Sequence, residues 1–316
     1  MHVVFGAGQI GASLARTLAR QGHPVRVVRR SGRPVDDLEV VAADATDPEA
    51  VLAASRGATV IHHCLNPSAY TGEAWTTELP PMNEALIAAA IAHDARLVVL
   101  DNLYAYGPTR EARREDSPMH PNGPKGRQRA GWHARLHAAT AEGLRWTAGR
   151  PGDFWGPGTS DQSLMAMSRV EGLGRGRPAL LLGDARAPHS FSYVPDVVDS
   201  LITLALAEAD VEGRVWHLPV HTIAPGDLVR RLARAQGRRG WYLALPGWFL
   251  RALAPVVPFF ATLTETLYQW ERPFLSDDSA FRARFTDVGT PIDAAVEATI
   301  ARLESEGRPA DTPQPA

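Results

Sequence analysis

The chain has 316 residues, a formal net charge of −2 at pH 7, a pI of about 6.6 and a single cysteine, Cys64. This balance provides no basic footprint for nucleic acid, so we expect no nucleic-acid partner. One cysteine excludes an intramolecular disulfide and fits the reducing cytoplasm. No uncharged apolar run is long enough to span a bilayer, and a strand predicted from residue 2 argues against a signal peptide.

The first motif is a glycine-rich turn. An apolar run at residues 3–5 predicts a buried strand, and G-x-G-x-x-G spacing follows it, before apolar residues recur at helical spacing. In this context the glycines allow a tight turn, a close pyrophosphate and a closely packed helix, whose N–H groups face the phosphates. The turn predicts a dinucleotide site, with a purely structural turn as the alternative. Its residues are Gly6, Gly8, Gln9, Ile10 and Gly11.

The end of the second predicted strand, residues 25–30, indicates which dinucleotide binds. An NAD site usually has Asp or Glu there to accept hydrogen bonds from the ribose hydroxyls. This chain has Arg29 and Arg30 instead. Guanidinium groups bind a 2′-phosphate through charge-assisted hydrogen bonds, whereas a carboxylate would repel it. The sequence therefore predicts NADP, with NAD less favoured, unless the arginines only form a solvated loop.

Strands and helices alternate along the rest of the chain. Further strands are predicted at residues 38–43, 59–63, 96–100, 144–148 and 215–218, and helices after Asp47 and over 82–93 and 126–142. Repeated strand–helix units predict an α/β fold with a doubly wound parallel sheet. No Cys/His/Asp spacing suggests a metal site.

Four segments resemble the extended and atypical short-chain dehydrogenase/reductases, the NAD-dependent epimerase/dehydratase group. Asp44 matches the acidic residue that contacts the adenine, and residues 103–108 match a "YG" turn. Residues 149–158 are similar to an RPxxxYGPG loop beside the nicotinamide, and 189–197 to an RxFxYVxD segment. The resemblance extends to about residue 302. It implies an NAD(P)-binding Rossmann fold, with Asp44, Ala45, Arg150 and Pro151 at the cofactor and Phe154, Trp155 and His189 at the substrate.

The catalytic positions depart from that family's pattern. The family uses Ser or Thr, Tyr and Lys, and the corresponding residues here are Asn102, Lys125 and Arg129. This substitution resembles the atypical branch, in which the tyrosine is often missing. Asn102 can donate and accept hydrogen bonds, which suits orienting a carbonyl or carboxamide. Tyr104 is a further candidate, because its phenol could supply a proton.

Lys125 is the only lysine in the chain. Unlike arginine, lysine can lose its proton when it is desolvated or lies beside another cation, and we expect Arg129 to be that neighbour. Lys125 is therefore a candidate general acid/base. The alternatives are a clamp for the ribose or phosphate of the cofactor and a solvated surface lysine.

The second half of the chain is predicted to alternate between two parts. Residues 1–151 and 190–218 form the NADP-binding domain, and residues 152–189 and 219–306 form a smaller, mostly helical substrate lobe. The tail 307–316 is rich in Pro and charge and is predicted to be disordered. The apolar stretch 241–260 is interpreted as helices lining a pocket or an oligomer interface, with peripheral membrane contact as a distant alternative.

Two function classes remain open. The first is an NADP-dependent oxidoreductase or epimerase/dehydratase acting on a hydroxyl or carbonyl group of a small organic substrate. The second is a non-catalytic NADP-binding sensor or scaffold. Sugar nucleotides are less favoured, because His189 stands where the family has a diphosphate-binding arginine. The predicted partners are a small-molecule substrate and, in a homodimer, a second copy of the chain.

Overall fold

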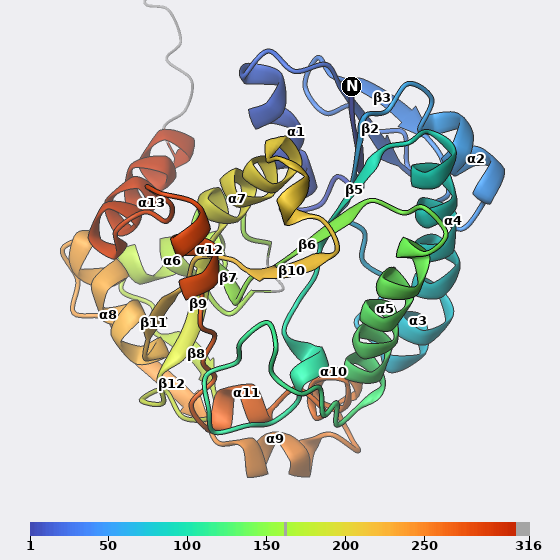
Figure 1. The fold of residues 1–316 in the computed structure, drawn as a ribbon. Helices are drawn as coiled ribbons and strands as arrows, with labels where there is room; N and C mark the ends of the chain where they lie inside the picture. Colours follow the sequence, from blue (N-terminus) through green and yellow to red (C-terminus); the bar gives the residue numbers. More distant parts are fainter. Residues whose placement is uncertain (161–162, 308–316) are drawn as a thin grey trace, which may run out of the picture.

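The computed structural model describes residues 1–160 and 163–307. At its centre lies a seven-stranded parallel sheet with strand order β10-β6-β5-β4-β1-β2-β3 (Figure 1). Its strands are β1 (His2–Phe5), β2 (Val25–Arg29), β3 (Glu39–Ala42), β4 (Val60–His63), β5 (Arg96–Leu100), β6 (Trp146–Arg150) and β10 (Arg214–His217). The strand order reverses between β1 and β4, where open α/β sheets bind their ligands. The predicted doubly wound α/β fold is confirmed.

Helices cover both faces of this sheet. On one face lie α1 (Gly11–Arg20) and α7 (Val194–Leu206), and on the other α2 (Pro48–Ala54), α4 (Leu79–Ala92) and α5 (Pro124–Thr140), with α3 (Gly72–Thr77) against α5. Alternate residues of a strand point to opposite faces. Accordingly Val3 and Phe5 enter the core under α4, whereas Val4 enters the core under α1 and α7.

Local residues set two helix ends, and the first of them, the predicted helix start after Asp47, is confirmed. Asp47 caps α2 by accepting hydrogen bonds from the N–H groups of Glu49 at 3.0 Å and Ala50 at 3.2 Å, and Pro48 follows it. Gly22 ends α1 at a φ of +84°, a conformation that favours glycine. These short-range signals fix the ends of both helices.

A smaller lobe holds two further sheets. A three-stranded sheet contains β7 (Asp153–Trp155), β9 (His189–Tyr193) and β11 (His221–Ile223), and a two-stranded sheet contains β8 (Ala179–Leu182) and β12 (Tyr242–Leu245). Its longer helices are α6 (Met167–Gly174), α8 (Pro225–Ala235) and α13 (Ile292–Gly307). Three short helices complete it: α9 (Gly247–Leu253), α10 (Pro258–Leu263) and α11 (Tyr268–Glu271). The helix α12 (Ser279–Arg284) instead packs against β10, and its Phe281 lies in the core under α1 and α7.

Two of the expected segments, 190–218 and the tail 307–316, can be compared with the structure. The segment 190–218, expected in the cofactor domain, begins in β9 of the lobe's sheet, and only α7 and β10 join the large sheet. Gly307 ends α13, and the rest of the expected tail lies outside the described residues. Within residues 1–160 and 163–307, no helix is long and apolar enough to cross a membrane, and no cluster of side chains suits a metal ion.

Two histidines share a hydrogen bond inside the sheet. His2 Nδ1 on β1 lies 3.0 Å from His62 Nε2 on β4, and both side chains are buried. Burial, followed by the charge of His2, lowers the pKa of His62 to about 3. Burial, followed by His23, lowers the pKa of His2 to about 4. Both imidazoles are therefore neutral in the folded protein at neutral pH.

Because both histidines are held neutral, we expect the folded protein to lose stability in mild acid. Between pH 6.5 and 4 the unfolded chain binds protons that the folded histidines do not, so the free energy of unfolding falls as the pH falls. Each such histidine contributes about 1.4 kcal/mol per pH unit in that window. Urea unfolding of His62→Gln should show a shallower pH dependence than the parent. His120→Gln, at an exposed histidine, is the control, and an equal effect of both variants would contradict the assignment.

Candidate cofactor and active site

The glycine-rich turn has the close approaches that its sequence predicts. Gly6 ends β1 with a φ of +95°, and a Cβ on it would lie 2.6 Å from the carbonyl oxygen of Cys64. A Cβ on Gly11 would lie 1.8 Å from the carbonyl oxygen of Gly6. Around Gly8, by contrast, a Cβ would meet no atom within 4 Å. Two of these glycines are thus required by packing, and the middle one leaves open space.

The start of α1 presents unpaired N–H groups beside that space. Among the described residues, the backbone N–H groups of Gly8, Gln9, Ile10 and Gly11 donate to no acceptor. The side chain of Ile10 is buried, so a ligand would meet its N–H rather than its side chain. The side-chain oxygen of Gln9 accepts a hydrogen bond from Ser160 N at 2.9 Å. Such donors at a helix N-terminus suit the pyrophosphate of a dinucleotide.

The carboxyl ends of the next two strands, β2 and β3, carry charged residues. Arg29 ends β2 half-buried and Arg30 is exposed, and neither guanidinium has a hydrogen bond or ion pair among the described residues. Asp44, after β3, accepts hydrogen bonds from Thr46 N and Oγ1 at 2.9 and 2.8 Å. These bonds, and more weakly the charge of Arg30, lower the pKa of Asp44. Arg30 and Asp44 therefore lie close together, while Ala45 is buried beneath them.

A buried ionic network lies at the carboxyl ends of β5 and β6. Asp101 accepts a hydrogen bond from Arg150 Nε at 2.7 Å and lies 3.5 Å from Arg129 Nη1. Burial acts to raise the pKa of Asp101, but Arg150 and Arg129 outweigh it and hold that pKa below its ordinary value. Arg150 has no exposed surface and donates to Asp101, and Asp101 is also the ionic partner of Arg129. The contact of Arg150 with the cofactor and the effect of Arg129 on Lys125 stay predictions.

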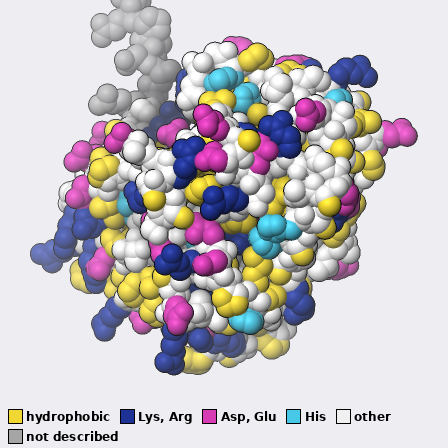
Figure 2. Space-filling model, in the orientation of Figure 1, with side chains coloured by type: hydrophobic (Ala, Val, Ile, Leu, Met, Phe, Trp, Pro, Cys, Tyr) yellow, Lys and Arg dark blue, Asp and Glu magenta, His cyan; other side chains and the backbone are white. Residues whose placement is uncertain are grey.

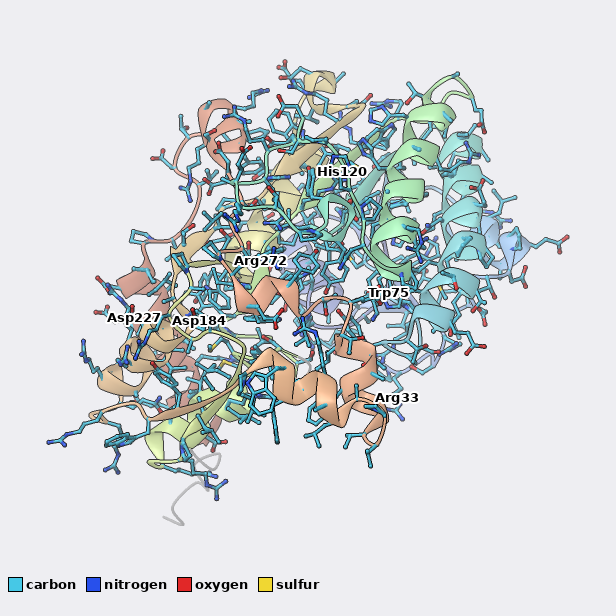
Figure 3. All side chains as sticks on the ribbon, turned by 90° about the horizontal axis from the view of Figure 1, so that it is seen from below. Arg33, Trp75, His120, Asp184, Asp227 and Arg272 are labelled. Atoms are coloured by element: carbon cyan, nitrogen blue, oxygen red, sulfur yellow. The ribbon has the colours of Figure 1, made fainter. Side chains whose placement is uncertain are left out.

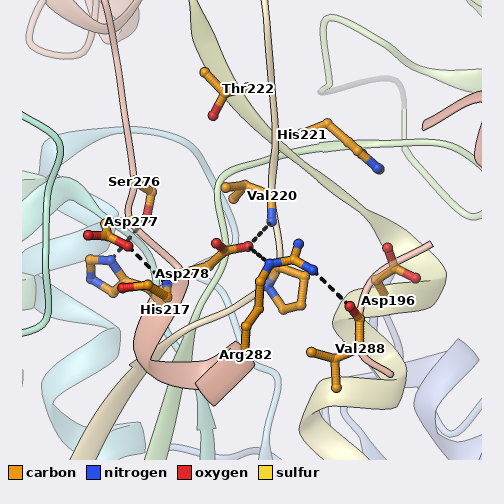
Figure 4. A network of polar contacts seen from close by, with 12 residues as sticks. Asp196, His217, Val220, His221, Thr222, Ser276, Asp277, Asp278, Arg282 and Val288 are labelled. Carbon is orange, nitrogen blue, oxygen red and sulfur yellow. Dashed lines mark hydrogen bonds and ion pairs between the residues drawn. The ribbon is translucent and has the colours of Figure 1, made fainter. Parts of the chain in front are cut away.

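The network continues toward the smaller lobe. Arg150 Nη1 donates to the hydroxyl of Tyr106 at 2.8 Å, and that hydroxyl lies 2.8 Å from His217 Nε2. Burial, followed by the charge of Arg150, lowers the pKa of His217 to about 3. Because the neutral ring accepts from Tyr106, its Nδ1–H donates to Ser276 Oγ at 3.0 Å (Figure 4). The chain of hydrogen bonds thus joins β5 and β6 to the segment after α11.

A second link to the same segment lies close by. Asp278 accepts hydrogen bonds from Val220 N and from Arg282 Nε, both at 2.9 Å (Figure 4). Arg282 Nη1 also donates to the carbonyl oxygen of Val288 at 2.8 Å. Together these contacts hold residues 276–288 across the end of β10.

Lys125 is buried in an ion pair. Its Nζ donates to Glu265 Oε1 at 2.6 Å and to the carbonyl oxygen of Thr262 at 2.7 Å, and it lies 4.1 Å from the ring centre of Tyr70. The backbone N–H of Lys125 donates to Glu265 Oε2 at 3.1 Å. The side chain is only 1% exposed, so the expectation of a solvated surface lysine is wrong. Lys125 therefore remains a candidate both for general acid/base catalysis and for holding the ribose or phosphate of the cofactor.

Two tyrosines meet beside this lysine. The hydroxyl groups of Tyr104 and Tyr70 lie 2.9 Å apart, and burial raises the pKa of Tyr70 to about 12 and that of Tyr104 well above its ordinary value. Both phenols are therefore protonated at neutral pH. Asn102 accepts a hydrogen bond from Tyr104 N at 3.0 Å and so fixes the turn that carries this tyrosine.

The predicted substrate residues divide into two groups. His189 Nε2 lies 2.6 Å from Asp153 Oδ2, and the imidazole stacks on Trp270 at 4.2 Å. Asp153 is near enough to Tyr70 and Tyr104 to raise the pKa of both, and Phe154 beside it is half-buried. Trp155 instead has no exposed surface.

Trp155 packs on Tyr193 and His221 in the core of the lobe. The contact of Trp155 with substrate stays a prediction.

Three residues of this site were not anticipated: Tyr70, Asp153 and Glu265. Asp153 lies within the loop similar to RPxxxYGPG, so its carboxylate was a usable signal. Tyr70 and Glu265 belong to segments with no motif, and Glu265 is 140 residues from the lysine that it contacts. No local pattern could have found that pair.

Comparison with known proteins gives a consistent result. Residues 2–218 match the family model described as NAD dependent epimerase/dehydratase family. No curated protein matches the chain.

Solved structures share the fold over nearly the whole chain. The dTDP-glucose 4,6-dehydratase DesIV from Streptomyces venezuelae matches at a TM-score of 0.77 and 19% identity, covering 98% of both chains. UDP-glucuronic acid 4-epimerase from Bacillus cereus matches at 0.74 and 15%, covering 96% of this chain and 99% of its own. UDP-glucose 4-epimerase from Thermus thermophilus matches at 0.72 and 19%, with the same coverage.

The glycines provide a matched pair of variants. Gly8→Ala places its methyl group in open space, so it should fold normally and weaken dinucleotide binding by about tenfold or more. Gly11→Ala drives its methyl group into the backbone of Gly6 and should cost about 1–3 kcal/mol of stability. Thermal unfolding and calorimetric titration measure the two effects. Unchanged binding by Gly8→Ala would show that the dinucleotide does not approach this turn.

Proposed function

This chain belongs to the NAD dependent epimerase/dehydratase family, and from that premise we propose that it binds NADP and acts on a hydroxyl or carbonyl group of a small organic substrate. Membership makes it a nicotinamide-dinucleotide enzyme of the extended short-chain dehydrogenase/reductase type. The single observation that supports the proposal most is the row of unpaired N–H groups at Gly8–Gly11 beside open space.

The residues at the carboxyl ends of β1, β2 and β3 fit this cofactor. The N–H groups at the start of α1 would hold the pyrophosphate, and Asp44 and Ala45 lie at the next strand end, where the adenosine would be held. When bound, the nicotinamide supplies or accepts a hydride. What remains for the protein is to orient the substrate and to move one proton.

The preference for NADP is supported by charge. Arg29 is half-buried, Arg30 is exposed, and neither has an ion pair among the described residues, so both guanidinium groups are available to a phosphate. Asp44 and Glu78 lie close enough to Arg30 for its charge to lower the pKa of both, which offsets part of the positive potential. We therefore expect a clear but moderate preference. The solved neighbours were crystallised with NAD, which makes NAD the competing cofactor.

We assign proton transfer to Lys125, and we propose that Glu265 exchanges protons between this lysine and the solvent. The ammonium group stands at the position that matches the family's tyrosine, and the side chain of Glu265 is 15% exposed, which connects the pair to solvent. Lysine can act as a general acid/base. The clamp role for Lys125 and proton donation by Tyr104 are the alternatives that a variant series separates.

A substrate without a diphosphate is favoured. Beside His189 stands the carboxylate of Asp153, which adds negative charge where a diphosphate would need positive charge. Asp153, the phenols of Tyr70 and Tyr104, and Asn102 together offer hydrogen bonds suited to neutral hydroxyl and carbonyl groups. The cytoplasm, suggested by the lone Cys64, and a homodimer both stay predictions.

The non-catalytic alternative has one observation in its favour. Lys125 and Tyr104 are both engaged with protein partners, so neither has an obviously free proton-transfer atom. A sensor would bind NADP and leave it chemically unchanged. Screening small aldehydes and ketones for NADPH oxidation, and small hydroxy compounds for epimerised or dehydrated products, distinguishes the two classes. Both assays are needed because an epimerase or dehydratase regenerates its cofactor and causes no net NADPH oxidation.

The cofactor preference predicts a charge-dependent difference in affinity. The parent should bind NADPH about tenfold or more tightly than NADH, because one charge-assisted contact contributes about 1.5–3 kcal/mol. Arg29→Ala/Arg30→Ala should remove most of that difference and leave NADH binding nearly unchanged. Calorimetric titration measures both, with Arg56→Ala, at the opposite end of the sheet, as the control. Equal or tighter binding of NADH by the parent would refute the preference.

The role of Lys125 is tested by substitution. Lys125→Met should lower the rate of NADPH oxidation by about 10²–10⁴-fold, the usual contribution of a general acid/base, with little change in NADP affinity. If the lysine is a clamp, Lys125→Arg retains most activity and Lys125→Met weakens NADP binding. Lys125→Met/Glu265→Gln avoids an unpaired buried carboxylate if the single variant folds poorly. Arg127→Met, at the exposed neighbour on α5, should match the parent in both measurements.

A further inference from the structure

Exposed apolar side chains gather on one surface of the lobe. We call this surface the aromatic patch, and it consists of Leu180, Trp241, Leu243, Trp248, Phe249 and Val256. Trp241 is 67% exposed, Trp248 68% and Val256 78%. Within the described part of the chain, only Leu52 and Leu206 are other large hydrophobic side chains of comparable exposure. Concentration on one face is unlike the scattered exposure that is normal on protein surfaces.

The fold brings the patch together from distant segments. Strands β8 and β12 pair in parallel, with Leu180 directly opposite Leu243. Pro246 then leads into α9, which carries Trp248 and Phe249, and Val256 follows that helix. Figures 1 and 3 both place α9 beside the end of the lobe that holds β8 and β12. The inner faces of these elements are filled by Leu182, Leu250 and Leu267, so the outer side chains have no place in the core.

The same surface is positively charged. Residues 174–183 and 236–260 contain five arginines and no aspartate or glutamate. Arg175 pairs with Glu171 and Arg251 with Glu271, whereas Arg177, Arg238 and Arg239 have no carboxylate partner among the described residues.

These three unpaired arginines line a depression of the surface together with Trp241. Figure 1 places α9 at the lower edge of the molecule. Figure 2, in the same orientation, shows dark blue Lys and Arg side chains and yellow hydrophobic side chains together along that edge.

We propose that the aromatic patch docks the protein peripherally on an anionic lipid membrane. Tryptophan is favoured at the membrane–water interface, where its ring meets acyl chains and its N–H meets head groups. Leucine, phenylalanine and valine add apolar area, and Arg177, Arg238 and Arg239 face the lipid phosphates. The contact leaves the glycine-rich turn, on the other domain, free to bind its cofactor.

Charge favours this occupant over a second copy of the chain. In a two-fold dimer formed through the patch, the same surface lies on both sides of the interface. Both sides of the interface would then carry the same excess of positive charge, and like charges repel. An anionic membrane instead provides the opposite charge over the whole surface.

Vesicle binding tests the proposal with the full chain. The parent should co-sediment with vesicles of equal parts phosphatidylglycerol and phosphatidylcholine, less at high salt, and its tryptophan emission should shift to shorter wavelength. Binding to phosphatidylcholine alone should be much weaker. Trp241→Ser/Trp248→Ser should lose at least about tenfold in binding, and Arg238→Ala/Arg239→Ala about fivefold for each arginine removed. Leu52→Ser/Leu206→Ser, which removes the exposed leucines elsewhere, should bind as the parent does.

The following outcomes would overturn the proposal, and a folding control accompanies them. Absence of binding to anionic vesicles, or equal loss in the leucine control, means that the patch does not dock on lipid. A dimer in sedimentation equilibrium that dissociates in Trp241→Ser/Trp248→Ser, without vesicle binding, identifies a second copy as the occupant. Unchanged melting temperature and dinucleotide affinity in the patch variants establish that a loss of vesicle binding is not a loss of fold.

Discussion

The candidate site depends on one buried carboxylate. Asp101, at the end of β5, has almost no exposed surface and lies between the guanidinium groups of Arg150 and Arg129. Because a charge out of water must be paired, these three residues fix the end of β5 relative to β6 and α5. The turn with Tyr104 follows β5, and α5 carries Lys125. The relative placement of Tyr104 and Lys125, the candidate proton donors, therefore rests on this ionic contact.

Features set by residues a few positions apart could be predicted from the sequence, whereas contacts between side chains of distant segments could not. Gly6, Gly8 and Gly11 act within a few residues of each other, so spacing alone showed where the backbone approaches closely and where it stays open. Arg150 and Trp155 lie in a recognisable loop, but nothing local indicates which side chains of that loop face inward. Their burial is decided by partners from other elements, such as Asp101 and Tyr193.

The departure from the family's catalytic residues is more than a substitution of one side chain. A lysine in place of a tyrosine requires a counter-charge when buried, and Glu265 from the distant lobe supplies it. Tyr70 and Tyr104 form a second layer of hydrogen bonds beside the pair. The proposed acid/base chemistry would thus be tied to the contact between lobe and sheet, which is also where Asp153 and His189 lie.

A crystal structure with NADP bound tests the proposed site most directly. We expect the pyrophosphate oxygens to accept hydrogen bonds from the N–H groups of Gly8–Gly11, and Arg29 or Arg30 to contact the 2′-phosphate. We also expect Lys125 to lie nearer to the nicotinamide than any other titratable side chain. A pyrophosphate away from the glycine-rich turn, or a 2′-phosphate that contacts only solvent, would contradict it.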